Sequence, residues 1–173
     1  MITYEVIYSK RKTLAVQVTA EGKVVVRAPW RYPAGSIRNF VETHADWIKK
    51  QQEAGRHRQE FWSQVTPEVE KACRKKARQV FPEKVAYYAE QMGVTYGRIS
   101  VRGQKTRWGS CSRDGNLNFN WKLMLFPERI QDYVVVHELA HRKEMNHSPA
   151  FYRCVEEIFP DYRACIRWLK ENA

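Results

Sequence analysis

The stretch HELAHRKEMNH, from His137 to His147, decides the fold predicted for this chain. It holds three of the five histidines in the sequence, and a glutamate follows the first of them. His137 and His141 are four residues apart, so on a helix their side chains lie on one face, one turn apart. Two imidazoles placed in this way can bind one cation. The pattern H-E-x-x-H therefore predicts a helix that carries a metal site.

Glu138 and His147 complete the predicted site. The side chain of Glu138 points about 100° around the helix from that of His137, so it lies outside the ligand set but can reach a water on the metal. His147 follows His141 by six residues, beyond the predicted end of the helix. Asn146 can adopt the left-handed backbone that turns a chain sharply, and such a turn would bring His147 back to the metal.

The predicted ligands His137, His141 and His147 favour a catalytic Zn²⁺, because three histidines without a thiolate leave the fourth position open for water. Bound zinc lowers the pKa of that water to about 7. Glu138 would accept the proton as the oxygen attacks a carbonyl, and would pass it to the leaving amine. The sequence thus predicts a zinc-dependent metallopeptidase that hydrolyses peptide bonds by Glu-assisted attack of a zinc-bound water.

Two other functions stay open at this point. One is a nucleic-acid-associated binding protein with a structural zinc site, in which Cys111 would close the coordination sphere as a fourth ligand. The other is a zinc hydrolase of small amides, which would use the same chemistry. Tyr133, one turn before His137, could support a ligand or an oxyanion, although packing in the core is favoured. Trp108, Trp121 and Phe151 are interpreted as core residues, and His44 and His57 are isolated on predicted helices.

The N-terminal part predicts a small sheet followed by helices. Residues 2–8, 13–19 and 23–28 alternate apolar and polar side chains, which indicates an N-terminal β-meander. A helix is expected from about residue 35, with a break in the charged stretch 52–58 at Gly55. A second, long helix is expected to run to about Met92, where Gly93 stops it.

The C-terminal part predicts a short sheet and three helices, which makes the fold class α+β. Residues 99–101 read as a strand, and Asp114-Gly115 is expected to turn the chain between two more. Pro127 opens the helix of the HExxH motif, and Ser148-Pro149 begins another. A last helix follows Pro160.

Composition limits the partners and the compartment. The formal net charge of +11 favours acidic partners, nucleic acid above all, as an alternative to a basic solvated surface. The start, MITYEVIYSKRK, lacks the apolar centre of a signal peptide, and the apolar runs are too short to span a bilayer. A cytoplasmic protein with no membrane partner is expected, and its four cysteines are interpreted as reduced thiols. The basic residues are spread along the chain, without a recognisable DNA-reading motif: Lys10, Arg11 and Lys12; Lys71, Arg74, Lys75, Lys76 and Arg78; and Arg98, Arg102, Lys105 and Arg107.

Several stretches, in this order, resemble the YgjP-like metallopeptidase family, which is related to the SprT-like and WLM zinc proteases. They are SKRKT at 9–13, GKVVVRAP at 22–29, KTRWGSCS at 105–112, NLNFNWKL at 116–123 and YVVVHELAHRKEMNHSPAF at 133–151. The resemblance covers most of the chain. The combination of RWGSCS with HELAH and NHS is specific.

The resemblance implies a zincin-like domain in which His137, His141 and His147 hold zinc and Glu138 is catalytic. It implies one domain over 1–173, with the sheet in 1–33, a helical segment in 34–96 and the metal-binding core in 97–173. It also implies a peptide or protein substrate, which an edge strand beside the active helix would pair with; segment 116–121 is the expected edge strand. Related WLM and SprT-like proteases act on proteins bound to DNA, which would suit the positive charge.

Overall fold

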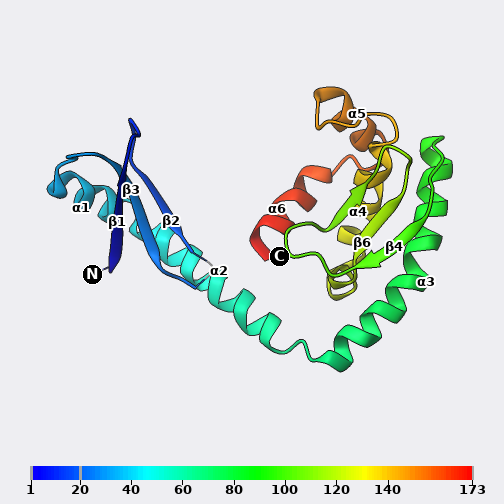
Figure 1. The fold of residues 1–173 in the computed structure, drawn as a ribbon, viewed down its shortest axis with the longest axis horizontal. Coiled ribbons are helices and arrows are strands. Elements are labelled where there is room, and N and C mark those ends of the chain that lie inside the picture. The colour runs from blue at the N-terminus through cyan, green and yellow to red at the C-terminus, as the bar shows by residue number, and fades with distance from the viewer. Residues whose placement is uncertain (1, 20, 173) are drawn as a thin grey trace. The chain divides into compact units, whose positions relative to one another are not determined.

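A computed structural model describes residues 2–19 and 21–172, which form two compact units (Figure 1). The N-terminal unit ends at Gln64, and the C-terminal unit runs from Val65 to Glu171. The boundary falls inside the predicted helical segment 34–96. Each unit combines helices with a three-stranded sheet, so the predicted α+β class is confirmed. Within the described ranges, no helix is both long and apolar enough to cross a membrane.

The sheet of the N-terminal unit contains β1 (Tyr4–Ser9), β2 (Ala15–Val18) and β3 (Val24–Pro29). The three predicted strands are confirmed, but the meander is wrong. The order is β1-β3-β2, with β3 parallel to β1 and antiparallel to β2. A meander would place β2 in the centre with antiparallel neighbours on both sides. β3 takes the centre instead because only this strand alternates fully buried residues along its length.

Two helices, α1 (Ala34–Thr43) and α2 (Ala45–Ser63), complete the N-terminal unit. Ile37, Val41 and Ile48 pack with the buried side chains of β3 to form its core. The predicted break at Gly55 is wrong, because α2 continues through this residue. An isolated glycine costs a helix only about 1 kcal/mol relative to alanine, which is too little to end it.

The C-terminal unit begins with the long helix α3 (Pro67–Met92). Thr66 caps its start by accepting a hydrogen bond from the backbone N–H of Val69 at 3.4 Å, and Pro67 suits the first turn. This is the capping signal that sequence analysis overlooked when it placed the break at Gly55. Gly93 ends α3 in the left-handed conformation, with φ at 62°, as predicted.

The second sheet contains β4 (Ile99–Arg102), β5 (Gly109–Cys111) and β6 (Leu117–Asn120) in the order β4-β6-β5. The predicted edge strand at 116–121 is therefore wrong: β6 lies in the centre. Leu117 and Phe119 are fully buried, and the ring of Phe119 stacks on Phe81 of α3 at a centroid distance of 4.5 Å. This apolar packing draws β6 inward and leaves β5 at the edge.

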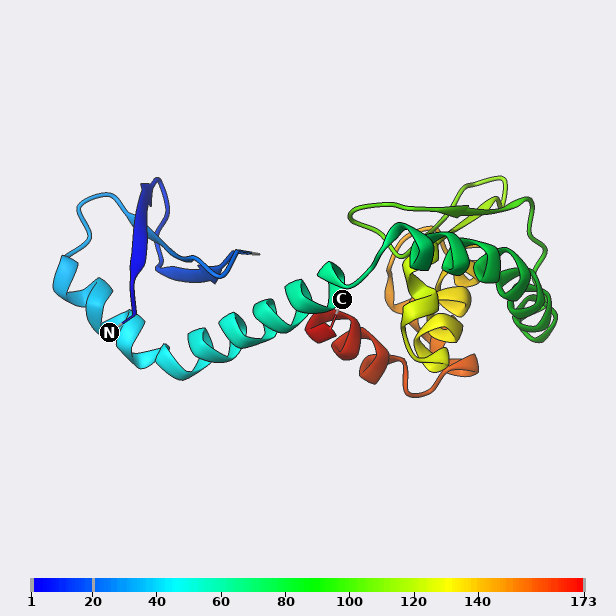
Figure 2. The ribbon, with the colours of Figure 1, turned by 90° about the horizontal axis from the view of Figure 1, so that it is seen from below.

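Four helical elements follow the sheet: η1 (Trp121–Leu125), α4 (Glu128–Ala140), α5 (Pro149–Ile158) and α6 (Tyr162–Asn172). The three predicted helices are confirmed, and the 3₁₀ helix η1 was not anticipated. The sheet covers one side of the C-terminal unit, with α4, α5 and α6 beneath it (Figures 1 and 2). Most residues of helix α4 are buried, and Val135, Val136 and Leu139 are fully buried. It is therefore the central helix of this unit.

The ion pairs of Lys84 fix α4 against α3. Its Nζ lies 2.7 Å from Glu128 and 2.6 Å from Asp132, both in the first half of α4. The side chains of Lys84 and Asp132 are only 13% and 18% exposed, so their pair is shielded from solvent more than the pair with Glu128, which is 78% exposed. They orient the helix that carries the HExxH motif.

Candidate metal centre

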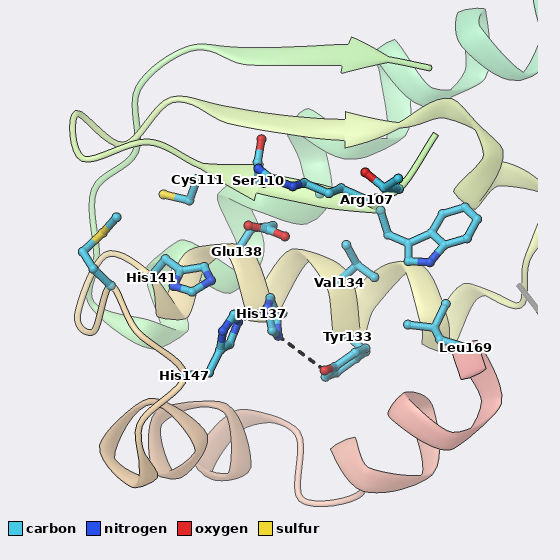
Figure 3. A pocket seen from close by; sticks show the side chains of 14 residues that line it. Arg107, Ser110, Cys111, Tyr133, Val134, His137, Glu138, His141, His147 and Leu169 are labelled. Atoms are coloured by element: carbon cyan, nitrogen blue, oxygen red, sulfur yellow. Dashed lines mark hydrogen bonds between the residues drawn. The ribbon is translucent and has the colours of Figure 1, made fainter. Parts of the chain in front are cut away.

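The structure brings the side chains of His137, His141 and His147 together in the C-terminal unit (Figure 3). One nitrogen from each imidazole lies within 4.8 Å of the other two. The Nε2 atoms of His137 and His147 are 3.0 Å apart. Two nitrogens on a tetrahedral zinc with bonds of about 2.0 Å lie about 3.3 Å apart, so this spacing suits a shared ion. The histidine cluster can therefore hold a metal ion.

The three histidines reach one point from two elements. His137 lies in α4 and His141 caps its C-terminus, whereas His147 belongs to the loop before α5. The predicted left-handed Asn146 is wrong: among the described residues other than glycine, only Arg31 has a positive φ. The loop instead turns through a hydrogen bond from the N–H of Ser148 to the carbonyl of Asn146 at 2.7 Å. Ser148 then caps α5, as predicted.

Two hydrogen bonds orient the imidazoles. His141 Nδ1 lies 3.1 Å from the carbonyl oxygen of Glu144, to which it donates, so its Nε2 keeps a free lone pair. His137 Nδ1 lies 3.3 Å from the hydroxyl oxygen of Tyr133, which is drawn as the dashed line in Figure 3. When this Nδ1 carries the proton, Nε2 of His137 is also free to bind a metal. Outer hydrogen bonds of this kind raise the affinity of metal sites.

The ring of Phe151 in α5 packs against the histidine cluster. Its ring centroid lies 4.9 Å from His137, 4.6 Å from His141 and 4.8 Å from His147. The side chain is fully buried, so its interpretation as a core residue is confirmed. One aromatic ring therefore packs against all three candidate ligands and limits their freedom.

The electrostatics suit a cation bound to neutral imidazoles. Burial, together with the smaller effect of the neighbouring His141 and His147, lowers the pKa of His137 to about 3. Burial is also the main cause that lowers the pKa of His141. Neutral imidazoles keep the lone pairs that a metal needs, and three of them leave room for a further ligand. The donor set on this side of α4 thus fits a divalent metal such as zinc.

Glu138 faces the other way, toward strand β5 (Figure 3). Its side chain is buried, and burial raises its pKa to about 8, although the positive charge of Arg107 acts in the opposite direction. A Cβ atom built on Gly109 would lie 2.5 Å from Oε1 of Glu138. The carboxylate therefore occupies space that only a glycine on β5 leaves open.

A cleft of about 540 Å³ opens over these residues. One wall is the segment 106–111, which contains β5, and the other is α4, with His147 toward one end and Leu169 of α6 toward the other (Figure 3). Cys111 lines this cleft but is not a member of the histidine group that could share an ion. Its thiol lies 3.3 Å from the carbonyl of Ser112, and burial raises its pKa. The cysteine is therefore not in place as a fourth ligand.

Strand β5 offers free backbone groups to the cleft. Trp108 accepts a hydrogen bond from Asn120 at 2.8 Å, and Ser112 donates one to Asn116 at 3.0 Å. Because antiparallel pairing alternates along a strand, the backbone groups of Gly109 and Cys111 point away from β6. β5 is thus an open edge strand beside α4.

Three further residues, which were not predicted from the sequence, hold this arrangement. Gly109 makes room for Glu138. The buried amide of Asn120 donates to the carbonyls of Gln104 and Arg107 at 2.8 and 3.0 Å, which fixes the loop before β5. The one sequence signal for this role of Asn120 is the presence of an asparagine at the end of an apolar strand.

The third missed residue, Arg142, ties the end of α4 to the sheet. Its guanidinium donates to the carbonyls of Thr95 and Arg113 at 2.9 and 2.8 Å. It also lies against Gly115, where a Cβ would meet its Cζ at 2.9 Å. This clamp fixes the chain directly after His141. By contrast, His44 and His57 lie in the N-terminal unit, in agreement with their exclusion from the site.

The family comparison agrees with this geometry at the level of a metallopeptidase. The model of the family "YgjP-like, metallopeptidase domain" matches residues 12–69 and 56–172. The chain therefore belongs to the YgjP-like metallopeptidase family. None of the curated proteins matches it.

Two solved structures are similar to part of the chain. The metallopeptidase zymogen abylysin of Pyrococcus abyssi is 22% identical, with a TM-score of 0.48, over 53% of this chain and 94% of its own. The metallopeptidase zymogen jannalysin of Methanocaldococcus jannaschii is 22% identical, with a TM-score of 0.45, over 52% of this chain and 91% of its own.

Proposed function

We propose that this protein is a zinc-dependent peptidase in which His137, His141 and His147 hold the metal and Glu138 is the general base. The convergence of three imidazoles beside a buried carboxylate is the observation that carries this proposal. Membership of a metallopeptidase family supports the same chemistry and implies a peptide or protein substrate.

A bound zinc ion would supply Lewis acidity, which polarises a peptide carbonyl and acidifies a water molecule. Beside a bound cation the raised pKa of Glu138 would also fall, so that its carboxylate can take the proton from that water and deliver it to the nitrogen of the leaving amine. Its position against the backbone of Gly109 limits the rotamers of the carboxylate, so proton transfer needs little rearrangement. Tyr133 and the carbonyl of Glu144 hold two of the imidazoles in the required orientation.

The open edge of β5 would orient an extended peptide substrate in the cleft. An extended peptide can pair with the free backbone groups of Gly109 and Cys111 and so add a strand to the sheet. This pairing would place a peptide bond between β5 and the histidine cluster on α4. A cleft lined by an edge strand favours a peptide over a small amide, which could not use the backbone pairing.

The first experiment measures zinc in purified protein by mass spectrometry. About one zinc per chain is expected, with a clear loss in His147→Ala. His57→Ala, an exposed histidine on α2, is the matched control and should keep the metal. A wild-type chain that takes up no zinc when the ion is supplied would rule out the proposal.

The second experiment follows cleavage of a mixed peptide library. Glu138→Gln should retain zinc but lose turnover, whereas Glu157→Gln, an exposed residue of α5, should behave as wild type. Turnover that persists in Glu138→Gln would contradict the assigned base. Cleavage of capped single amino-acid amides as fast as longer peptides would favour the small-amide hydrolase instead.

We also propose a cytoplasmic location, which the four free cysteines support.

A further inference from the structure

The N-terminal unit has an aromatic and basic surface at one end of its sheet. Strands β1 and β3 are parallel, with Ser9 opposite Pro29, so both chains leave the sheet at the same end (Figure 1). We call this surface the β1/β3 rim; it consists of residues 8–12 and 30–32. None of these residues takes part in the metal centre.

Two aromatic rings form part of the rim. The rings of Tyr8 and Trp30 are almost parallel, at an interplanar angle of 16° and a centroid distance of 6.4 Å. Tyr8 is 38% exposed and Trp30 is 64% exposed. A tryptophan this exposed gains little from folding, so its presence next to a second ring indicates a binding surface.

Four cations of the rim are close to these two residues in the sequence: Lys10, Arg11, Lys12 and Arg31. The sequence has no Asp or Glu from residue 6 to 20 or from 22 to 41. None of the ion pairs found among the described residues uses these four side chains. The buried Nε of Arg11 also has no hydrogen-bond partner in the described part of the chain. The rim is therefore a concentration of positive charge without internal neutralisation.

Arg31 stands in a backbone conformation that suits glycine. A hydrogen bond from the N–H of Tyr32 to the carbonyl of Pro29, at 3.3 Å, closes a turn in which Arg31 is the third residue. Its φ is 60°, in the left-handed region that other residues seldom adopt. Stability alone would favour glycine at this position. A strained residue other than glycine is typical of a functional position.

We propose that the β1/β3 rim binds single-stranded nucleic acid. Unpaired bases would stack on Trp30 and Tyr8, and the backbone phosphates would pair with the four cations. A single strand fits better than a duplex, because only unpaired bases expose their faces to side chains. An acidic peptide would satisfy the cations but would leave the aromatic pair without a partner.

The test is the fluorescence anisotropy of a labelled oligothymidine titrated with the full chain at low salt. Trp30→Ala should weaken binding by roughly fivefold to a hundredfold, which is the range for the loss of one stacked base. Trp47→Ala is the matched control, because this tryptophan of α2 is 44% exposed and has no place in the rim. It should bind the oligonucleotide as tightly as the wild type.

Arg31→Gly separates binding from folding. The substitution relieves the left-handed strain, so the Tm should stay the same or rise. Affinity should nevertheless fall, and the slope of log K against log salt should decrease by about 0.7, as expected for one lost phosphate contact on a single strand. Lys49→Ala, an exposed cation of α2, should leave this slope unchanged.

Several results would overturn the proposal. Binding that is absent at low salt, or that Trp30→Ala and Trp47→Ala weaken equally, would remove the stacking role. Equal affinity for heparin, for a duplex or for anionic phosphatidylserine vesicles would reduce the rim to a general anion surface. A dimer in light scattering that Trp30→Ala dissolves, without oligonucleotide binding, would assign the rim to a second copy of the chain. Zinc removal should not change oligonucleotide binding, so this test is independent of the proposed peptidase activity.

Discussion

The carboxylate of Glu138 lies in the space that a side chain at Gly109 would fill, with its Oε1 only 2.5 Å from the position of the missing Cβ. The two residues come from different elements, one from α4 and the other from β5. Their contact joins the motif that carries the candidate base to the strand edge that would bind substrate. A glycine in RWGSCS is therefore required by a side chain in HELAH.

Gly109→Ala should separate metal binding from catalysis. The new methyl group must push the carboxylate of Glu138 aside, and misplacement by about 1 Å can cost roughly a hundredfold in rate. The three histidines lie on the other side of α4 from Gly109, so zinc content should not change. The measurements are kcat/KM on a cleaved peptide and zinc by mass spectrometry.

The control for this variant is Gly55→Ala in α2, where a Cβ would meet no atom within 4 Å. It should leave activity unchanged and stabilise the chain by up to about 1 kcal/mol. Full peptidase activity in Gly109→Ala would show that the position of Glu138 is not critical.

Tyr133→Phe should weaken zinc binding without unfolding the protein. The hydroxyl of Tyr133 is the partner of Nδ1 in His137, and loss of such a partner typically costs about 10- to 100-fold in metal affinity. Competition with a chromophoric chelator measures the change. Tyr88→Phe, a half-buried tyrosine of α3 outside the cleft, serves as the control. Equal zinc affinity in both variants would mean that the hydroxyl does not orient the imidazole.

Asn120→Asp should destabilise the loop that leads into β5. A carboxylate cannot donate to the carbonyls of Gln104 and Arg107, so two buried hydrogen bonds are lost and a charge is buried in their place. We expect a loss of about 3 kcal/mol in the free energy of unfolding, measured with urea. Asn118→Asp, on the half-buried face of the same strand, should cost much less. Similar losses in the two variants would contradict the assigned role.

Phe151→Ala should reduce both stability and metal affinity. Removal of a fully buried phenylalanine costs about 3–5 kcal/mol, and here the cavity would lie under all three histidines. Thermal unfolding with and without zinc should show a smaller stabilisation by the metal than in the wild type. Phe61→Ala, which removes a 41% exposed ring in α2, is expected to change both quantities little.

Local patterns in the sequence predicted much of the metal centre. The four-residue spacing of His137 and His141 fixes their common helix face, and the cap at Ser148 limits the length of the loop that returns His147. The capping and turn signals at Gly93 and Pro127 also placed helix ends correctly. Each of these inferences depends on residues close together in the chain.

The errors concern long-range relationships. Alternation of apolar residues indicates that 2–8, 13–19 and 23–28 are strands, but it does not say which strands pair, so the meander was wrong. For the same reason, the segment 116–121 was wrongly predicted to be the edge strand; the strand at that edge is β5. The roles of Gly109 and Asn120 are contacts with segments far along the chain, and no local pattern encodes them.

The location of the three imidazoles in the sequence bears on the order of folding. His137 and His147 are ten residues apart, so their meeting closes only a short loop, which costs little chain entropy. The contact of Glu138 with Gly109 instead needs β5 to pair with β6 and to dock on α4. In the proposed enzyme, metal binding would therefore depend on contacts close in the sequence, whereas alignment of Glu138 with the strand edge depends on contacts between distant segments, which are expected to form later. If the proposed function holds, a partly folded chain would bind its metal before it could cleave another protein.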